Sequence, residues 1–243
     1  MRIDGRQSHQ LRPVTLKLGT QEFAEGSCLI QMERTRVLCA VTVEDRVPPF
    51  LRGQRKGWVT AEYGMLPRST QVRTPRESVE GRPGGRTVEI QRLIGRSLRA
   101  VTDLSALGEH TFIVDCDVLQ ADGGTRTAAI TGGCLALYQA MHTLVKKGLL
   151  ETVPMRELVA AVSAGVVAGT EVLDLCYEED SRAEADFNIV RTEGGLFVEV
   201  QGTAEGKPFS RGAMDSILAL AEDGLAQLFR AQREAIKALV AGG

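Results

Sequence analysis

Apolar and polar residues alternate along the first part of the chain, with the period of two that is typical of strands buried on one face. Turn-forming pairs, Gly19-Thr20 and Glu33-Arg34, separate the alternating segments. We therefore expect an antiparallel meander. Its strands are predicted over residues 13–19, 26–32 and 36–45, and a further strand over residues 57–66.

The pattern changes at residues 67–85, which contain three prolines and three glycines and show no sustained apolar periodicity. This composition predicts a long exposed loop, and loops of that length usually have a function or are disordered. From Ile90 to Val101, apolar residues recur at steps of three and four, which predicts an amphipathic helix. Its opposite face presents Arg92, Arg96 and Arg99.

The remaining elements repeat the order of strands followed by a helix. A strand is predicted over residues 111–120 and a helix over residues 127–147. Four more strands (158–167, 172–177, 185–192 and 196–203) precede a helix over residues 211–239, which Gly224 is expected to interrupt. The order of strands followed by helices occurs twice along the chain. This repetition predicts an α+β fold of two similar halves, which we place at residues 1–150 and 151–243.

The composition is that of an ordinary globular protein. The 243 residues are 43% hydrophobic and 25% charged, which excludes a disordered, collagenous or coiled-coil chain. The longest uncharged run, residues 127–145, is too polar for a membrane span. The five cysteines form no C-x-x-C pair and the three histidines are scattered, which argues against zinc. Because no segment of signal-peptide type is found, we expect a cytoplasmic protein.

Positive charge is concentrated in one window. Residues 52–99 contain 11 basic and four acidic residues, so this window carries +7 while the whole chain carries −2. Ten of the 11 are arginine, the side chain best suited to forked recognition of phosphate. The window predicts a phosphate-rich partner such as nucleic acid, although a solvated arginine-rich surface has the same composition.

Common catalytic signatures are absent: the chain has no G-x-x-x-x-G-K-[ST], no G-x-G-x-x-G and no G-x-S-x-G motif. This absence favours catalysis in which the protein supplies no nucleophile of its own. Gly123-Gly124-Thr125-Arg126 lies between a predicted strand and helix, where free N–H groups and the helix dipole favour a phosphate. Gly84-Gly85-Arg86 has the same order of glycines and arginine at the start of the preceding predicted helix. The alternative is a tight turn with a solvated Arg126.

Residues 174–188 are rich in acids and contain a single arginine. Asp180, just after a predicted strand, and Asp186, early in the next, are expected to face each other across a hairpin. Such a pair can hold Mg²⁺ through two carboxylates and several waters, and one of the two can act as a general acid. A solvated acidic turn is the alternative, because such turns are common on protein surfaces.

Several long motifs, in the same order along nearly the whole chain, resemble those of the ribonuclease PH family. The N-terminal motif is Arg2-Ile3-Asp4-Gly5-Arg6. The others cover residues 63–70, 85–86, 90–99, 117–126 and 178–181.

The resemblance implies an α+β fold of duplicated β-α-β type, related to the second domain of ribosomal protein S5, in a homohexameric ring built as a trimer of dimers. It implies a phosphate-dependent 3′-to-5′ exoribonuclease that trims the nucleotides following the CCA end of tRNA precursors. Each nucleotide leaves as a nucleoside diphosphate, and the reverse reaction adds nucleotides from diphosphates. Inorganic phosphate is then a co-substrate and Mg²⁺ the cofactor.

The family's site residues are carried over onto matching positions of this sequence. The implied phosphate-binding residues are Arg86, Gly124, Thr125 and Arg126. The implied metal and catalytic carboxylates are Asp180 and Asp186. From its crowded acidic neighbours Asp180 is our candidate for the proton donor, with Asp186 as the alternative. The implied tRNA-binding residues are Arg68, Arg73 and Arg76, to which the basic helix adds Arg92, Arg96 and Arg99.

Two other functions compete with this interpretation. One is an RNA-binding ring subunit without catalysis, which has no need of Arg86, Arg126, Asp180 and Asp186 together. The other is a phosphorylase of small nucleosides, which has no need of a long arginine-rich loop.

Overall fold

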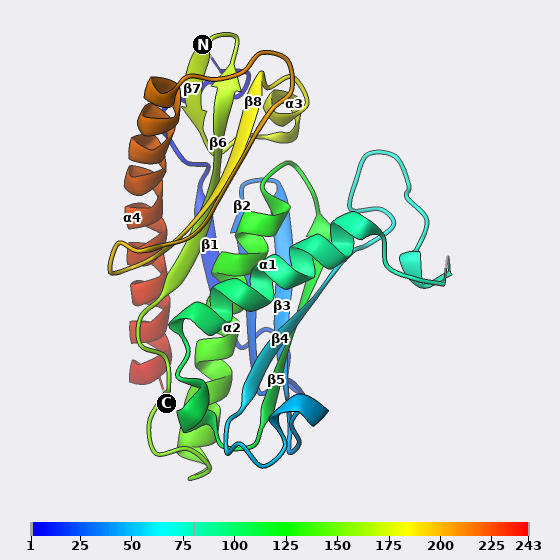
Figure 1. Cartoon of the computed structure of the whole chain (residues 1–243), viewed down its shortest axis with the longest axis vertical. Coiled ribbons are helices and arrows are strands. Elements are labelled where there is room, and N and C mark those ends of the chain that lie inside the picture. The colour runs from blue at the N-terminus through cyan, green and yellow to red at the C-terminus, as the bar shows by residue number, and fades with distance from the viewer. Residues whose placement is uncertain (1, 80, 243) are drawn as a thin grey trace.

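In the computed structural model, which describes residues 2–79 and 81–242, the strands form two sheets (Figure 1). The first sheet has the order β1-β2-β3-β5-β4 and is antiparallel except between β4 and β5. A parallel pair needs a crossover, and helix α1 (Gly85–Val101) provides it. The strands are β1 (Val14–Leu18), β2 (Gly26–Met32), β3 (Thr35–Glu44), β4 (Trp58–Met65) and β5 (Thr111–Gln120).

The second sheet is antiparallel throughout and has the order β7-β6-β8-β9. The one-turn helix α3 (Tyr177–Asp180) lies between β7 and β8 along the chain. The strands are β6 (Val159–Val167), β7 (Thr170–Leu173), β8 (Ala185–Thr192) and β9 (Phe197–Ala204). Short 3-10 turns occur at Pro49–Leu51, Glu77–Val79 and Leu104–Leu107.

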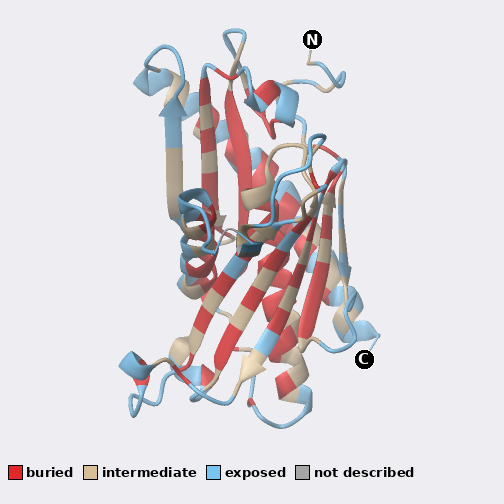
Figure 2. Ribbon diagram, turned by 90° about the vertical axis from the view of Figure 1, so that its right-hand side faces the viewer, coloured by how far each residue is buried: buried red, intermediate tan, exposed pale blue. Residues whose placement is uncertain are grey.

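Helix α2 (Thr125–Lys146) lies between the two sheets and packs on β2 and β3 on one side and on β6 on the other. Packing on both sides explains why its sequence is apolar nearly all round. Helix α4 (Arg211–Ala241) covers β6 and β7 and also contacts β1, so one hydrophobic core runs through both sheets. Figure 2 shows buried positions alternating with less buried ones along the strands, as the sequence pattern predicted.

The α+β class and the strands of both sheets agree with the sequence prediction, with two corrections. The strand predicted over residues 172–177 ends at Leu173, because Asp174 adopts a left-handed conformation with φ 54° and turns the chain toward α3. Gly224 does not interrupt α4 but allows it to pack closely, since a Cβ there would lie 2.9 Å from Leu173 Cδ2. Among the described helices, none combines the length and apolarity needed to span a membrane.

Candidate active site

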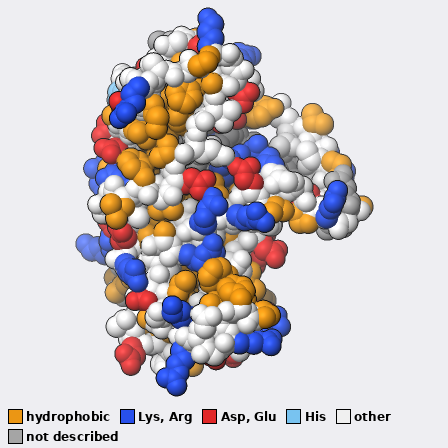
Figure 3. All heavy atoms as spheres, in the orientation of Figure 1, with side chains coloured by type: hydrophobic (Ala, Val, Ile, Leu, Met, Phe, Trp, Pro, Cys, Tyr) orange, Lys and Arg blue, Asp and Glu red, His pale blue; other side chains and the backbone are white. Residues whose placement is uncertain are grey.

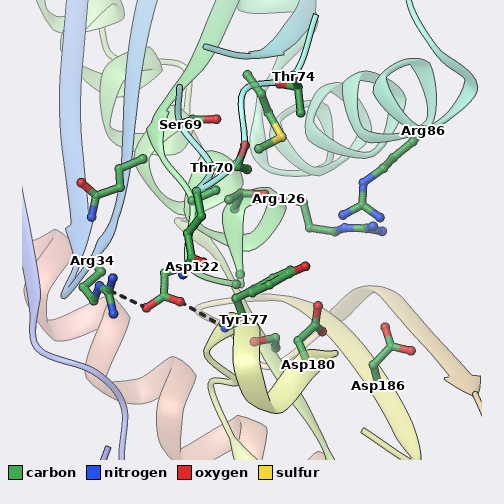
Figure 4. Close-up of a pocket in the computed structure, with 18 of the residues that line it drawn as sticks. Arg34, Ser69, Thr70, Thr74, Arg86, Asp122, Arg126, Tyr177, Asp180 and Asp186 are labelled. Atoms are coloured by element: carbon green, nitrogen blue, oxygen red, sulfur yellow. Dashed lines mark hydrogen bonds and ion pairs between the residues drawn. The ribbon is translucent and has the colours of Figure 1, made fainter. Parts of the chain in front are cut away.

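A cavity of about 800 Å³ lies where the β5–α2 loop, the start of α1, helix α3 and strand β8 converge (Figure 4). It brings together groups that the sequence places far apart. The predicted site residues that line it are Arg68, Arg86, Gly124, Thr125, Arg126, Asp180 and Asp186. The two glycine–arginine motifs and the acidic pair therefore share one site.

The loop between β5 and α2 forms an anion seat at one wall of the cavity. Gly123 and Gly124 have φ values of 75° and 66°, a backbone conformation that favours glycine. Gly124 is the N-cap of α2 and has no side chain to cap the helix, which leaves the first backbone N–H groups for a ligand. Because the helix dipole adds partial positive charge at this end, the loop is suited to phosphate.

Tyr63 supports the seat from strand β4, and sequence reasoning did not single it out. Its hydroxyl lies 2.8 Å from Thr125 Oγ1, and either oxygen can donate. Burial raises the pKa of Tyr63, and the Thr125 hydrogen bond and the charges of Arg86 and Arg126 only partly offset this. The phenol therefore stays protonated, and when it donates, the Thr125 hydroxyl proton is free for an anion.

Arg126 is held in place by two residues that the sequence analysis also missed. Its Nη1 donates to Gln201 Oε1 at 3.0 Å and lies 3.8 Å from Glu89 Oε1. Gln201 Nε2 in turn donates to Glu89 Oε1 at 2.8 Å. Arg86 makes no side-chain hydrogen bond or ion pair with any residue that the structure describes, and Figure 4 shows it extending toward Arg126. Two neighbouring guanidinium groups, one of them without a partner among the described residues, favour a bound anion.

Asp180 and Asp186 lie side by side on the opposite wall (Figure 4). Asp180 is the last residue of α3 and Asp186 lies in β8, so the expected hairpin between two strands is wrong for Asp180. Desolvation raises the pKa of Asp180, as does the charge of Asp186, while Arg86 and Arg126 act in the opposite direction. No described residue forms an ion pair with either carboxylate.

Two unpaired carboxylates fit a hard divalent cation, which prefers oxygen ligands. A second group of possible ligands, Asp4, Cys176 and Glu179, lies outside the cavity lining. Its carboxylates already accept hydrogen bonds from arginines: Glu179 from Arg2, and Asp4 from Arg6. The acidic pair in the cavity is therefore the better candidate for a metal.

The remaining predicted RNA-binding arginines lie either in the loop before α1 or on α1 itself. Arg68 lines the cavity and donates to the Gln71 carbonyl at 3.0 Å, whereas Arg73 and Arg76 are exposed farther along the same loop. The helix arginines do not line the cavity. Figure 3 shows basic side chains gathered across the middle of the face that carries α1.

The three helix arginines differ in their contacts. Arg92 is exposed, and Arg96 pairs with Glu199 at 2.5 Å. Arg99 donates to the Val59 carbonyl at 2.8 Å and stacks over Trp58, with Cζ 4.4 Å from the ring centroid. Arg96 and Arg99 thus already have partners within the protein, and an RNA contact by any of the three stays a prediction.

The geometry sets an anion seat with two arginines opposite two carboxylates, a site suited to chemistry on phosphate groups. Residues 10–142 match the model of the 3′ exoribonuclease family, domain 1, and residues 157–224 match domain 2 of the same family. A ribonuclease PH of Dehalococcoides mccartyi is 58% identical over 232 residues, covering 96% of both chains. The chain belongs to the 3′ exoribonuclease family, and its reaction is that of ribonuclease PH: phosphate-dependent removal of nucleotides from RNA 3′ ends.

Solved structures support the fold. Rice (Oryza sativa) Rrp46 is 22% identical, with 97% of this chain and 98% of that chain covered and a TM-score of 0.75. The Archaeoglobus fulgidus exosome with RNA bound to the active site contains a chain 24% identical, with coverage of 97% and 92% and a TM-score of 0.78. The predicted fold class and family are confirmed.

Proposed function

We propose that this chain trims the nucleotides that follow the CCA end of tRNA precursors, and also acts on other structured RNAs with 3′ tails. It works in the cytoplasm as a homohexameric ring, a trimer of dimers. The observation that carries the chemistry is the shared cavity, in which an anion seat with two arginines faces two carboxylates that form no ion pair with a described residue. The name of the 58% identical relative, ribonuclease PH, supports RNA as the substrate.

In the proposed reaction, an oxygen of inorganic phosphate attacks the phosphorus of the terminal phosphodiester. A new P–O–P bond forms, the bond to the 3′-oxygen of the preceding ribose breaks, and the terminal nucleotide leaves as a diphosphate. Two anions must meet, so Arg86, Arg126 and the N–H groups at the start of α2 hold the phosphate and offset its charge. The product keeps an anhydride bond, which makes the reaction reversible.

Asp180 and Asp186 would hold Mg²⁺, which supplies charge stabilisation at the scissile group when it is bound. Asp180 acts first as the general acid: its protonated form donates the proton to the leaving 3′-oxygen, and the carboxylate that remains would share Mg²⁺ with Asp186. Its raised pKa, caused by desolvation and by the charge of Asp186, favours the protonated carboxyl that this role needs.

Phosphate carrying a radioactive phosphorus tests the proposal directly. The chain is mixed with 3′-extended tRNA, Mg²⁺ and labelled phosphate, and the released nucleotides are separated. We expect nucleoside diphosphates with the label in the β position and RNA that ends at CCA. Unlabelled monophosphates would mean hydrolysis, and RNA binding without release would mean a scaffold subunit. Either result contradicts the proposal.

Replacing Arg68, Arg73 and Arg76 together by alanine should weaken binding of precursor tRNA. The log–log salt slope should flatten by about 2 units if each arginine meets one phosphate. Degradation of a short unstructured RNA should fall less, because only Arg68 of the three lines the cavity, whereas Arg73 and Arg76 are exposed beyond it. Equal losses of activity on both substrates would contradict the assignment of these arginines to the tRNA body. Sedimentation checks that the ring remains assembled.

A further inference from the structure

A buried arginine connects the two walls of the cavity. The side chains of Arg12 and Asp174 are 0% and 1% exposed. Arg12 Nη2 and Nε donate to the two carboxylate oxygens of Asp174 at 2.6 and 3.0 Å. Its Nη1 donates to the Asp122 carbonyl at 2.6 Å, in the loop that forms the anion seat. One guanidinium therefore joins the anion seat to the segment that leads into α3.

A second arginine of the same N-terminal segment holds α3 itself. Arg2 Nε and Nη2 donate to the two carboxylate oxygens of Glu179 at 2.8 and 2.6 Å. Arg2 also donates to the carbonyls of Leu173 and Asp174 at 2.7 and 2.9 Å. Because Glu179 directly precedes Asp180, this fork fixes the helical turn that carries the Asp180 carboxylate.

The anion seat and α3 are also in direct backbone contact. A Cβ added to Gly123 would lie 2.5 Å from the Leu175 carbonyl oxygen and 2.9 Å from the Tyr177 nitrogen. The Tyr177 N–H donates to Asp122 Oδ1 at 3.4 Å, a contact marked in Figure 4. The two walls therefore meet directly at this point, and their relative placement depends on the residues that hold each of them.

We propose that Arg2 and Arg12 are positioning residues for phosphorolysis, which set the placement of Asp180 relative to the phosphate bound at α2. The inference rests on the proposed function, because this placement matters only if phosphate and Asp180 act on the same bond. A buried ion pair is weak evidence for stability, since desolvation offsets the attraction, so a geometric role explains these contacts better. Misplacement by 1 Å can cost a reaction about 100-fold in rate.

The two arginines should give different kinetic signatures. Arg2→Ala should lower kcat by about 10- to 100-fold. The KM for phosphate should stay nearly unchanged, because Arg2 does not contact the anion seat. Arg12→Lys keeps a charge for Asp174 but lacks the fork that reaches Asp122, so it should lower kcat and raise the KM for phosphate.

Arg233→Ala is the control for loss of a forked ion pair as such, because Arg233 forms a forked pair with Glu193 at the surface, outside the cavity lining. It should leave both kinetic parameters at wild-type values. Rates are expressed per folded, assembled protein, as measured by circular dichroism and sedimentation. Added millimolar guanidinium should restore part of the kcat of Arg2→Ala. If the variant lost activity only because its fold is unstable, guanidinium would not restore the kcat.

A kcat of Arg2→Ala equal to that of wild type, or a loss that follows only the amount of folded protein, overturns the inference. If Arg2→Ala does not fold, Arg2→Lys is measured, and an unchanged kcat there has the same meaning. A wild-type chain without phosphorolysis contradicts the proposed function instead. The two failures are therefore distinguishable.

Discussion

Replacing Arg126 by alanine should reduce phosphorolysis by about two to three orders of magnitude while the protein stays folded and assembled. The loss corresponds to about 3 to 4 kcal/mol of transition-state stabilisation, because the arginine offers a charge-assisted contact to an anion in a partly shielded cavity. Arg126 is 14% exposed, whereas its partner Glu89 is 53% exposed. Its removal therefore strands no buried charge, and the fold should tolerate it.

Two further variants make this prediction specific. Arg86→Ala should cause a similar loss, since Arg86 lines the same cavity. Arg126→Lys should restore activity poorly, because an ammonium lacks the planar fork of the guanidinium. The measurements are kcat and the KM for phosphate, with the exposed Arg230→Ala on α4 as the control. If Arg126→Ala keeps a near-normal kcat and a near-normal KM for phosphate, Arg126 does not bind phosphate.

The sheets could be predicted from sequence because their strands are buried on one face, so that burial alternates as the residues do. Helix α3 could not. Its start depends on Asp174, whose left-handed conformation is held by Arg2, Arg6 and Arg12, more than 160 residues earlier in the chain. No local pattern encodes such a contact, and the apolar residues on both sides of Asp174 predict a strand that continues to Tyr177.

The same distinction applies to the site. Gly124 and Arg126 were predictable because glycine before a helix start has a local physical meaning. Tyr63 reaches Thr125 only through the pairing of β4 with β5, and Gln201 reaches Arg126 only through the packing of β9 near α1. Supporting residues of this kind have no sequence signal of their own, because their role depends on how distant strands align.

The second large effect is expected for Asp180→Asn, which should abolish phosphorolysis and the reverse polymerisation together. Both directions pass through one transition state, so a group that stabilises it serves both. The amide keeps the shape of the side chain but loses the charge for Mg²⁺ and the transferable proton. Binding of tRNA should stay nearly intact, because Arg73 and Arg76, which we assign to tRNA, do not line the cavity.

The matched control for this variant is Glu178→Gln on the same short helix. Glu178 does not line the cavity and pairs with Arg182 at the surface, so its loss should leave both directions unchanged. Phosphorolysis is measured as release of nucleoside diphosphate and polymerisation as extension of RNA by diphosphates, each at saturating substrate. If Asp180→Asn loses only one direction under matched conditions, Asp180 does not act in a transition state that both directions share.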